Sequence, residues 1–542
     1  MRKIKTNMLL TASVIVATLL FSSCGKEKSG YNLDYLAVQL SKGDSWSIID
    51  KEGNVVVKEE YPAESEISEI RDGVYWVKTG DKYQLYDIEN PKKPVIDEEF
   101  SDVTIFSAGV AVVSNPNEQI RFIDTNGKTV TTLGKHIKRC YLLSEEGYAA
   151  YCTQENLWGI IDCKGKDVIK AIFSNIISWN DGIVLAEKRT DNNLVILDIA
   201  SNKTLGEINT EKYDRMFSYI SEEKLVVKNA GNEEGSYIVL DKTGKKLFDI
   251  KKSFARLGCL FYSNGYLVFG NEDQKYGVAN DKGEITIRPK YDDLINNLGE
   301  GLFMAKKGEK WGVIDSEDNM VIDFDYSDRG FRMGDKFVMP DGNSYSLINR
   351  DGKEIISFDA ITAEHRSYVD YVDMDGLSTS VINTITELEK ALPISQAVKT
   401  AFKDLNIENA HYSRGLTHKD NIDDKIQLEL ELMYDDNLAE EKTHVEKVND
   451  GWFTYERKVS DGWNWSNAIP QNISGTISLS YGKGINIKDL YKTLMTKLSE
   501  GRMKISDTKY SKTVKTRNET VECQTELTLN DENIGVEMVF RR

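Results

Sequence analysis

The stretch EKWGVIDSEDN, Glu309 to Asn319, decides the fold because its pattern recurs along the chain. An aromatic residue leads an apolar run, an Asp or Asn closes the run, and a polar turn follows. Nine such runs occur, and their closing residues are 34 to 43 residues apart. The runs are WSIID (Trp46–Asp50), YQLYD (Tyr83–Asp87), IRFID (Ile120–Asp124), WGIID (Trp158–Asp162), LVILD (Leu194–Asp198), YIVLD (Tyr237–Asp241), YGVAN (Tyr276–Asn280), WGVID (Trp311–Asp315) and YSLIN (Tyr345–Asn349). This regular spacing predicts a repeat protein.

Each unit is expected to consist of short β-strands. In the eighth unit, β-branched and aromatic residues predict strands at Gly301–Lys306, Lys310–Asp315 and Met320–Tyr326. The Asp or Asn that closes a run can accept hydrogen bonds from the turn backbone, and a Gly three residues later supplies the positive φ of a tight hairpin. We therefore interpret the recurring Asp residues as turn caps. A ring of calcium ligands would need several carboxylates that converge on one ion.

The Trp-Gly pair itself stands at two units, Trp158-Gly159 and Trp311-Gly312, and Tyr276-Gly277 is a near match. Trp46, Tyr83 and Tyr345 keep the aromatic residue without the glycine. A glycine inside a strand marks a close approach of another backbone. We expect the aromatic ring before it to pack between neighbouring repeats. The functional alternative is an aromatic residue that stacks on a sugar, which we expect at selected units and on loops.

The KWGVID pattern, with a turn glycine after it and a period of about 37 residues, resembles that of bacterial WG-repeat (KWG) proteins. The resemblance covers residues 31–360 and implies an architecture more than an activity. Three or four short strands per unit suit a β-propeller, whose closed ring hides the strand edges. We predict a mainly β fold with a propeller-like array of about eight to nine repeats; the alternative is an open β-solenoid.

The first residues, MRKIKTNMLLTASVIVATLLFSSCGKEKSG, have the features of a secretory signal. A basic segment precedes an apolar core that is short for a bilayer span. The end of that core resembles a bacterial lipobox, which implies a signal peptide at residues 1–23, lipidation of Cys24 and a tether at residues 24–30. By the same resemblance we expect a lipoprotein of the cell envelope, held in the outer membrane on its periplasmic or its outer face.

Charge and cysteine content exclude several classes of partner and site. Lys and Arg number 69 against 87 Asp and Glu, a formal net charge of −18, so the chain offers no field that attracts nucleic acid. Five cysteines follow Cys24 at irregular spacings without a C-x-x-C pair, which speaks against a disulfide scaffold or a zinc site. Most are expected to be small buried residues. One disulfide among Cys140, Cys152 and Cys163 is left open.

The sequence changes character after about residue 360 and predicts a duplicated α+β module, with copies at residues 361–465 and 466–542. Amphipathic helices are expected at Ile394–Leu405 and Ile487–Leu498, and each precedes an alternating strand, Ile426–Leu432 or Val521–Leu529. The expected unit is β-α-β-β with one optional further strand, in which helices cover one face of an antiparallel sheet.

No catalytic, nucleotide-binding or metal-binding motif is present, so we assign no catalytic residues, no metal ligands and no cofactor. Asp373 is expected to cap a helix. The segment DGWNWSN places Trp463 and Trp465 on one side of an extended strand. Paired tryptophans can stack on a sugar or anchor a protein, so these two form a candidate binding patch, against the alternative of a core or strand-edge role.

The resulting hypothesis is a lipid-anchored envelope protein that acts as a non-catalytic interaction platform for a protein or glycan. An enzyme is the first alternative, namely a propeller-based glycan hydrolase or lyase, because such enzymes take catalytic residues from separated loops. A structural spacer is the second alternative.

Overall fold

A computed structural model describes residues 33–180, 182–214, 220–229, 237–250, 256–257, 262–271, 273–295, 298–362, 367–390, 415–421, 426–434, 440–449, 454–464, 470–479, 486–515, 520–530 and 533–541. The chain divides into two compact units. The first comprises residues 1–115 and 119–371, and the second comprises residues 116–118 and 372–542. The sequence placed the end of the repeat region at residue 360. The first unit continues to Tyr371 because two further strands, β36 (Ala360–Thr362) and β37 (Tyr368–Asp370), pair with strands of the repeats.

The first unit consists of nine small antiparallel sheets, one for each sequence run, which we call blades 1 to 9. Counted without the added strand β37 of blade 4, the run forms the third strand of every blade. Blades 1 to 4 contain, in sheet order, β36 (Ala360–Thr362), β1 (Tyr35–Gln39), β2 (Trp46–Asp50), β3 (Val55–Tyr61); β4 (Glu66–Ile67), β5 (Val74–Thr79), β6 (Lys82–Asp87); β7 (Asp102–Val103), β8 (Val110–Ser114), β9 (Arg121–Asp124), β10 (Thr129–Thr132); and β37 (Tyr368–Asp370), β11 (Ile137–Tyr141), β12 (Tyr148–Thr153), β13 (Trp158–Asp162), β14 (Asp167–Phe173).

Blades 5 to 9 repeat the arrangement. They contain β15 (Asn175–Asn180), β16 (Ile183–Glu187), β17 (Leu194–Asp198), β18 (Lys203–Ile208); β19 (Tyr213–Asp214), β21 (Lys224–Asn229), β22 (Tyr237–Asp241), β23 (Lys246–Ile250), with β20 (Ile220–Ser221) beside β21; β24 (Arg256–Leu257), β25 (Tyr266–Gly270), β26 (Tyr276–Asn280), β27 (Ile285–Tyr291); β28 (Asp293–Ile295), β29 (Leu302–Lys307), β30 (Lys310–Asp315), β31 (Met320–Tyr326); and β32 (Phe331–Met333), β33 (Lys336–Asp341), β34 (Ser344–Ile348), β35 (Glu354–Phe358).

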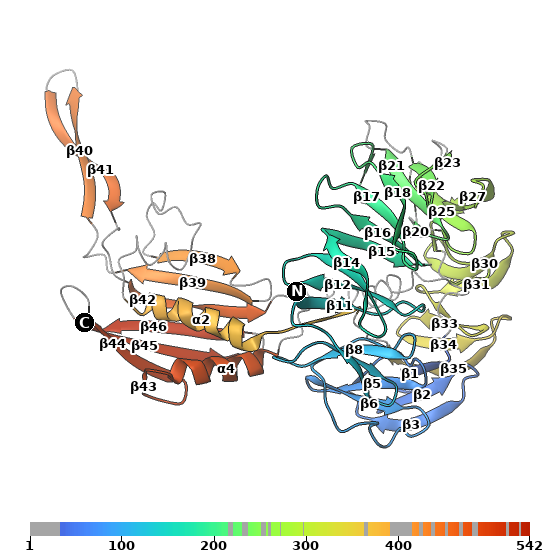
Figure 1. The fold of residues 1–542 in the computed structure, drawn as a ribbon, viewed down its shortest axis with the longest axis horizontal. Coiled ribbons are helices and arrows are strands. Elements are labelled where there is room, and N and C mark those ends of the chain that lie inside the picture. The colour runs from blue at the N-terminus through green and yellow to red at the C-terminus, as the bar shows by residue number, and fades with distance from the viewer. Residues whose placement is uncertain are drawn as a thin grey trace. The chain divides into compact units, whose positions relative to one another are not determined.

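The nine blades form a closed ring. Strand β36, from the end of the repeat region, pairs with β1 from its beginning, in a register that places Ile361 opposite Val38. Every blade also shares a cluster of buried apolar side chains with the next blade. A ninth cluster joins the last blade to the first and contains Met333, Val338 and Leu36. Figure 1 shows the yellow strands of blade 9 beside the blue strands of blade 1. The fold is therefore a propeller and not an open solenoid.

Burial separates an inner edge from an outer edge in each blade. In blade 8, Phe303 and Met304 of β29 are fully buried, whereas Met320 at the start of β31 is 59 % exposed. The fourth strands of the other blades are likewise the more exposed ones, as in β3, β10, β27 and β35. The first strands thus lie toward the axis of the ring, as in other propellers. Strand β37 extends blade 4 beyond its first strand, at the inner edge.

The polar turn after each run joins the third strand to the fourth. Asp315 Oδ1 accepts hydrogen bonds from the backbone N–H groups of Glu317 and Asn319, at 2.9 and 2.8 Å. The corresponding oxygen makes the same two bonds at six other turns, at Asp50, Asp124, Asp162, Asp241, Asn280 and Asn349. The turn glycine also contacts the preceding blade: a Cβ added to Gly53 of blade 1 would lie 2.7 Å from a methyl group of Ile355 in blade 9.

The glycine of the Trp-Gly pair lies under a bulge of the fourth strand. In blade 8 the register between β30 and β31 shifts on both sides of Val313. A Cβ on Gly312 would lie 2.7 Å from the carbonyl oxygen of Ile322 and 3.0 Å from that of Asp323. Similar shifts accompany Gly159 and Gly277. At these three glycines the outer strand therefore approaches the third strand too closely for a side chain.

The second unit is built on one seven-stranded sheet. Its strands, in sheet order, are β38 (Gly415–Asn421), β39 (Ile426–Tyr434), β42 (Pro470–Leu479), β46 (Asn533–Arg541), β45 (Thr520–Leu529), β44 (Lys509–Lys515) and β43 (Met503–Lys504). Helices α2 (Met374–Leu388) and α4 (Ile487–Ser499) pack on one face of this sheet around a single apolar core. Asp373 caps α2 by accepting a hydrogen bond from Gly376 N–H. A separate hairpin consists of β40 (Glu440–Asn449) and β41 (Thr454–Asn464).

The duplication is present in this sheet, but its unit differs from the one expected. Among the described elements, α2 is followed by β38, β39, the hairpin β40–β41 and β42, and α4 is followed by β43, β44, β45 and β46. Each helix thus precedes three long strands of the shared sheet, namely β38, β39 and β42 or β44, β45 and β46. The two sets of three strands meet at β42 and β46, which places the copies side by side in one sheet. The strand expected before the first helix is β37, which belongs to the ring instead. The helix expected at residues 394–405 lies outside the described residues.

Replacing Gly312 with alanine should destabilise the ring by about 2–3 kcal/mol, because the backbone oxygens of Ile322 and Asp323 leave no room for the methyl group. The matched control is Gly535→Ala in β46, where the nearest atom would lie 3.6 Å away. Urea-induced unfolding of the two variants measures the difference. Equal losses in both would show that the close approach at Gly312 is unimportant.

The turn caps also make a prediction about pH. Partial burial would raise the pKa of the Asp315 carboxyl, but hydrogen bonds from Asn319 and Glu317 outweigh this effect and hold the pKa below its ordinary value. A carboxyl whose pKa is lower in the folded state stabilises above its unfolded pKa of about 4, and this stabilisation is lost as the pH falls through the folded pKa.

We therefore expect the stability difference between the native chain and Asp315→Asn to shrink when unfolding is measured at pH 3 instead of pH 7. Asparagine occupies the equivalent position at Asn280 and Asn349 and accepts the same bonds, so the loss at pH 7 should stay below about 1 kcal/mol. Asp315→Ala, which removes the acceptor, should cost more at both pH values. A difference that is independent of pH would contradict this account.

Candidate functional site

The inner edge of blade 4 carries an ion pair between distant parts of the chain. Strand β37 pairs with β11, and the register places Asp370 opposite Arg139 and Tyr368 opposite Tyr141. Arg139 donates from Nε and Nη2 to the two carboxylate oxygens of Asp370, at 2.7 and 2.9 Å. The Asp370 side chain is 1 % exposed and that of Arg139 is 18 % exposed. This buried bidentate pair fixes β37 to the ring.

Tyr368 packs on the guanidinium of Arg139, and Tyr141 links Tyr368 to two tryptophans, Trp158 and Trp179; we call these five residues the Arg139 aromatic cluster. The guanidinium carbon lies 4.0 Å from the ring centroid of Tyr368. The ring of Tyr141 then contacts those of Tyr368, Trp158 and Trp179, with centroids at 5.2, 5.7 and 5.4 Å. None of the three pairs is stacked face to face. The rings thus form a compact group of edges and tilted faces.

Small residues on the intervening strand bring these rings together. In the register of blade 4, Arg139 lies opposite Cys152 of β12, and Cys152 lies opposite Trp158 of β13. Ala150, two residues before Cys152, faces the same side of the blade. Because the side chains at 150 and 152 are short, Tyr141 from the first strand and Trp158 from the third strand reach each other above β12. Trp179 comes from the first strand of blade 5 and closes the group.

The aromatic residues of this cluster combine partial exposure with two indole N–H groups that no described residue accepts. Tyr141, Trp158, Trp179 and Tyr368 are each partly exposed. The indole N–H groups of Trp158 and Trp179 have no hydrogen-bond partner among the described residues. Two other ring tryptophans contrast with them: Trp46 and Trp76 donate their indole N–H groups to backbone carbonyls at 3.1 and 2.9 Å and are at most 7 % exposed.

The electrostatics of the cluster keep its polar groups in one protonation state at neutral pH. Burial would lower the pKa of the Arg139 guanidinium, but the hydrogen bonds and charge of Asp370 outweigh it and raise the pKa. Burial raises the pKa of the Tyr141 hydroxyl, against the opposing effect of the nearby guanidinium. Tyr141 therefore remains neutral, and Arg139 remains charged and neutralised by its partner.

The residues singled out from the sequence lie in different surroundings. Trp46 and Trp311 are buried in the clusters between blades 1 and 2 and between blades 8 and 9, and Tyr276 packs partly between blades 7 and 8. Trp158 packs partly between blades 4 and 5 and belongs to the Arg139 aromatic cluster. Trp463 lies in β41, opposite Glu441. Cys24 and Trp465 lie outside the described residues.

Sequence reasoning did not find four of the five residues of the cluster. Arg139, Tyr141 and Trp179 lie outside the recurring motif, and Tyr368 was assigned to the C-terminal module. The sequence offered one indication of the cluster, because Trp158 belongs to the recurring motif. Unlike Trp311, which holds the same motif position, Trp158 is partly exposed. Its surroundings depend on a strand that is 231 residues away along the chain from Arg139.

The described residues contain neither a metal-binding cluster nor a disulfide. These residues contain no group of three or more His, Cys, Asp or Glu side chains that could hold a metal ion. Cys140, Cys152 and Cys163 are free thiols, so the disulfide left open among them does not form, and Cys523 is also free. Three of these four are buried, as expected for small apolar residues. No helix in the described part of the chain is long and apolar enough to cross a bilayer.

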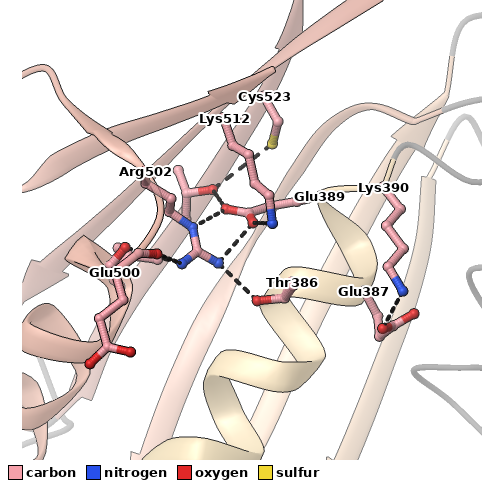
Figure 2. A network of polar contacts seen from close by, with 10 residues as sticks. Thr386, Glu387, Glu389, Lys390, Glu500, Arg502, Lys512 and Cys523 are labelled. Atoms are coloured by element: carbon pink, nitrogen blue, oxygen red, sulfur yellow. Dashed lines mark hydrogen bonds and ion pairs between the residues drawn. The ribbon is translucent and has the colours of Figure 1, made fainter. Parts of the chain in front are cut away.

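The second unit contains a buried polar network that links the ends of its two helices to the sheet. Figure 2 shows Arg502, after α4, beside Glu389, the residue that follows α2. Arg502 donates from Nε and Nη2 to the two oxygens of Glu389, each at 2.8 Å, and the side chains are 4 % and 1 % exposed. The Thr525 hydroxyl also donates to Glu389, and Arg502 Nη1 donates to the Leu498 carbonyl. Every carboxylate oxygen is engaged, so the network joins both helix ends to β45 and leaves no open group.

Comparison with known proteins supports the repeat architecture. A family model described as "WG containing repeat" matches residues 46–83 and 276–311. Each match runs from the aromatic residue of one run to that of the next, so the repeat family is found at two places in the ring. No curated protein matches the chain.

Among solved structures, the chain is similar to a eukaryotic initiation factor, with 13 % identity, a TM-score of 0.42 and coverage of 62 % of this chain and 98 % of that chain. It is similar to BamB from Moraxella catarrhalis, with 13 % identity, a TM-score of 0.28 and coverage of 53 % and 98 %. It is also similar to apo AztD from Citrobacter koseri, with 10 % identity, a TM-score of 0.29 and coverage of 62 % and 96 %.

Replacing Glu389 with glutamine should destabilise the second unit by about 3 kcal/mol, because it leaves the buried Arg502 guanidinium without a counter-charge. The matched control is Glu387→Gln in the same helix, whose partner Lys390 is exposed and whose loss should cost less than about 0.5 kcal/mol. Thermal unfolding gives the loss, and amide hydrogen exchange assigns it to α4 and β45. A loss of stability of similar size in both variants would contradict a stabilising role for the Glu389–Arg502 ion pair.

Proposed function

We propose that the chain is a bacterial envelope lipoprotein whose ring acts as a non-catalytic platform for a protein or glycan partner. A repeat β-propeller-like fold is in general a scaffold for interactions, since it presents a broad rigid surface made of many similar units. The single observation that carries the proposal is the Arg139 aromatic cluster. It combines partly exposed aromatic rings with two indole N–H donors that no described residue accepts, as recognition sites commonly do.

Attachment to the membrane is the second part of the proposal and rests on the sequence. The basic segment, the short apolar core and the residues Phe21-Ser22-Ser23-Cys24 resemble those of bacterial lipoproteins, and Gly25 after the cysteine favours the outer membrane. Lipid attached at Cys24 would hold the ring at the membrane surface without a spanning helix.

A platform accounts for the inner edge of the ring better than a hydrolase does. The buried carboxylate at the inner edge of blade 4, Asp370, receives two hydrogen bonds from Arg139. The guanidinium occupies both oxygens of this carboxylate, whereas a glycosidase needs one carboxylic acid free to reach the substrate beside a second carboxylate. The pair is suited to positioning Tyr368 and Arg139 for binding.

Two measurements test the platform. Metabolic labelling with a fatty-acid analogue should label the native chain and leave Cys24→Ala unlabelled; an unlabelled native chain would refute the lipid anchor. A tagged Cys24→Ala form incubated with solubilised envelope should retain a protein or glycan partner. Retention should fall in Trp179→Ala, which removes a ring of the cluster, and should persist in Trp311→Phe. Absence of any retained partner would refute the platform.

A further inference from the structure

We propose that the Arg139 aromatic cluster binds a single sugar ring of a neutral oligosaccharide. The inference rests on the proposed function and names the chemical class of the partner at that same site. It goes beyond the sequence, in which Trp158 was expected to be a packing residue.

The first argument concerns size and shape. The ring of Tyr141 contacts each of the other three rings, with centroids 5.2 to 5.7 Å apart. Each of the four rings is partly exposed, so the surface around Tyr141 presents aromatic area from a small group of rings. The C–H face of a pyranose ring covers one aromatic face, so a group of this size accommodates one sugar unit. An extended peptide would need a longer groove with successive pockets.

The second argument concerns hydrogen bonds. A sugar ring carries hydroxyl groups at its edge, and burying them against apolar surface is costly unless they are paired. The cluster supplies donors for them, namely the indole N–H groups of Trp158 and Trp179. The hydroxyl of Tyr368 adds a group that can donate or accept. Trp46 and Trp76 lack this capacity because their N–H groups are already bonded to backbone carbonyls.

The third argument concerns charge and specifies a neutral sugar. The positive charge of Arg139 is balanced by Asp370 in a bidentate pair, so the site offers no unpaired cation for a carboxylate or phosphate. The chain as a whole carries a formal net charge of −18, which repels anionic polysaccharides. The guanidinium carbon of Arg139 also lies 4.0 Å from the centroid of the Tyr368 ring, and this contact orients the ring before a ligand arrives.

The site can be tested by isothermal titration calorimetry on the full chain with Cys24→Ala. The probes are a tetramer of β-1,4-linked N-acetylglucosamine, a hexamer of β-1,4-linked glucose and a hexamer of α-1,4-linked glucose. At least one should bind with a millimolar or tighter dissociation constant. Trp158→Phe keeps a ring and removes one N–H donor, so it should weaken binding about three- to tenfold. Trp179→Ala removes a ring and should abolish measurable binding.

The matched control is Trp311→Phe, the same change at the same strand position in blade 8, where the ring is 4 % exposed. It should leave binding unchanged, and circular dichroism confirms that each variant is folded. The proposal is overturned if none of the three sugars binds, if binding is equal in Trp158→Phe, Trp179→Ala and the control, or if a decaproline peptide binds through the cluster in place of the sugars.

This result is separable from that of the platform experiment. A partner that is retained from the envelope and survives treatment with glycan-degrading enzymes, combined with no binding of the sugars, would refute the sugar site and leave the platform intact. Loss of all retained partners refutes the platform itself.

Discussion

Mutual burial between neighbouring blades is the interaction on which the rest of the structure depends. A small sheet of three or four short strands has two apolar faces and cannot bury either one alone. Each of the nine apolar clusters draws its side chains from two blades, and the last cluster joins blade 9 to blade 1. Closure by β36 removes the two ends that an open array would expose. The order of every blade thus depends on its two neighbours.

The recurring polar and glycine residues serve this packing. In seven of the nine units the Asp or Asn that closes the run satisfies two backbone N–H groups in the turn. The turn glycine lets the backbone approach the blade before it, as Gly53 approaches Ile355. The glycine of the Trp-Gly pair lets the outer strand cross over the third strand, as Ile322 does over Gly312. Asn280 and Asn349 make the same turn bonds, so the requirement at the turn is an acceptor and not a charge.

The sequence was informative where the determinants are local. The repeat, the mainly β architecture, the strands of the eighth unit and the turn caps follow from patterns within one unit, and the structure contains them. It was less informative where two distant segments meet. The pairing of β36 with β1, the addition of β37 to blade 4 and the shared sheet of the second unit depend on contacts across long stretches of chain. The exposure of Trp158 depends on the same long-range placement, which is why the motif alone predicted packing there.

Ring closure is tested most directly by a disulfide between β1 and β36. Val38 and Ile361 are opposite each other in this pair of strands, within the range of Cα separations that a disulfide spans. The double variant Val38→Cys/Ile361→Cys should cross-link on mild oxidation, and mass spectrometry of the digest should identify the linked peptides. Ser47 lies opposite Val38 on the far side of β1, so Ser47→Cys/Ile361→Cys places the thiols roughly 10 Å apart and should not cross-link. A cross-link in the first pair alone is the result that the closed ring predicts. No link in the first pair, or equal linking in both, would contradict it.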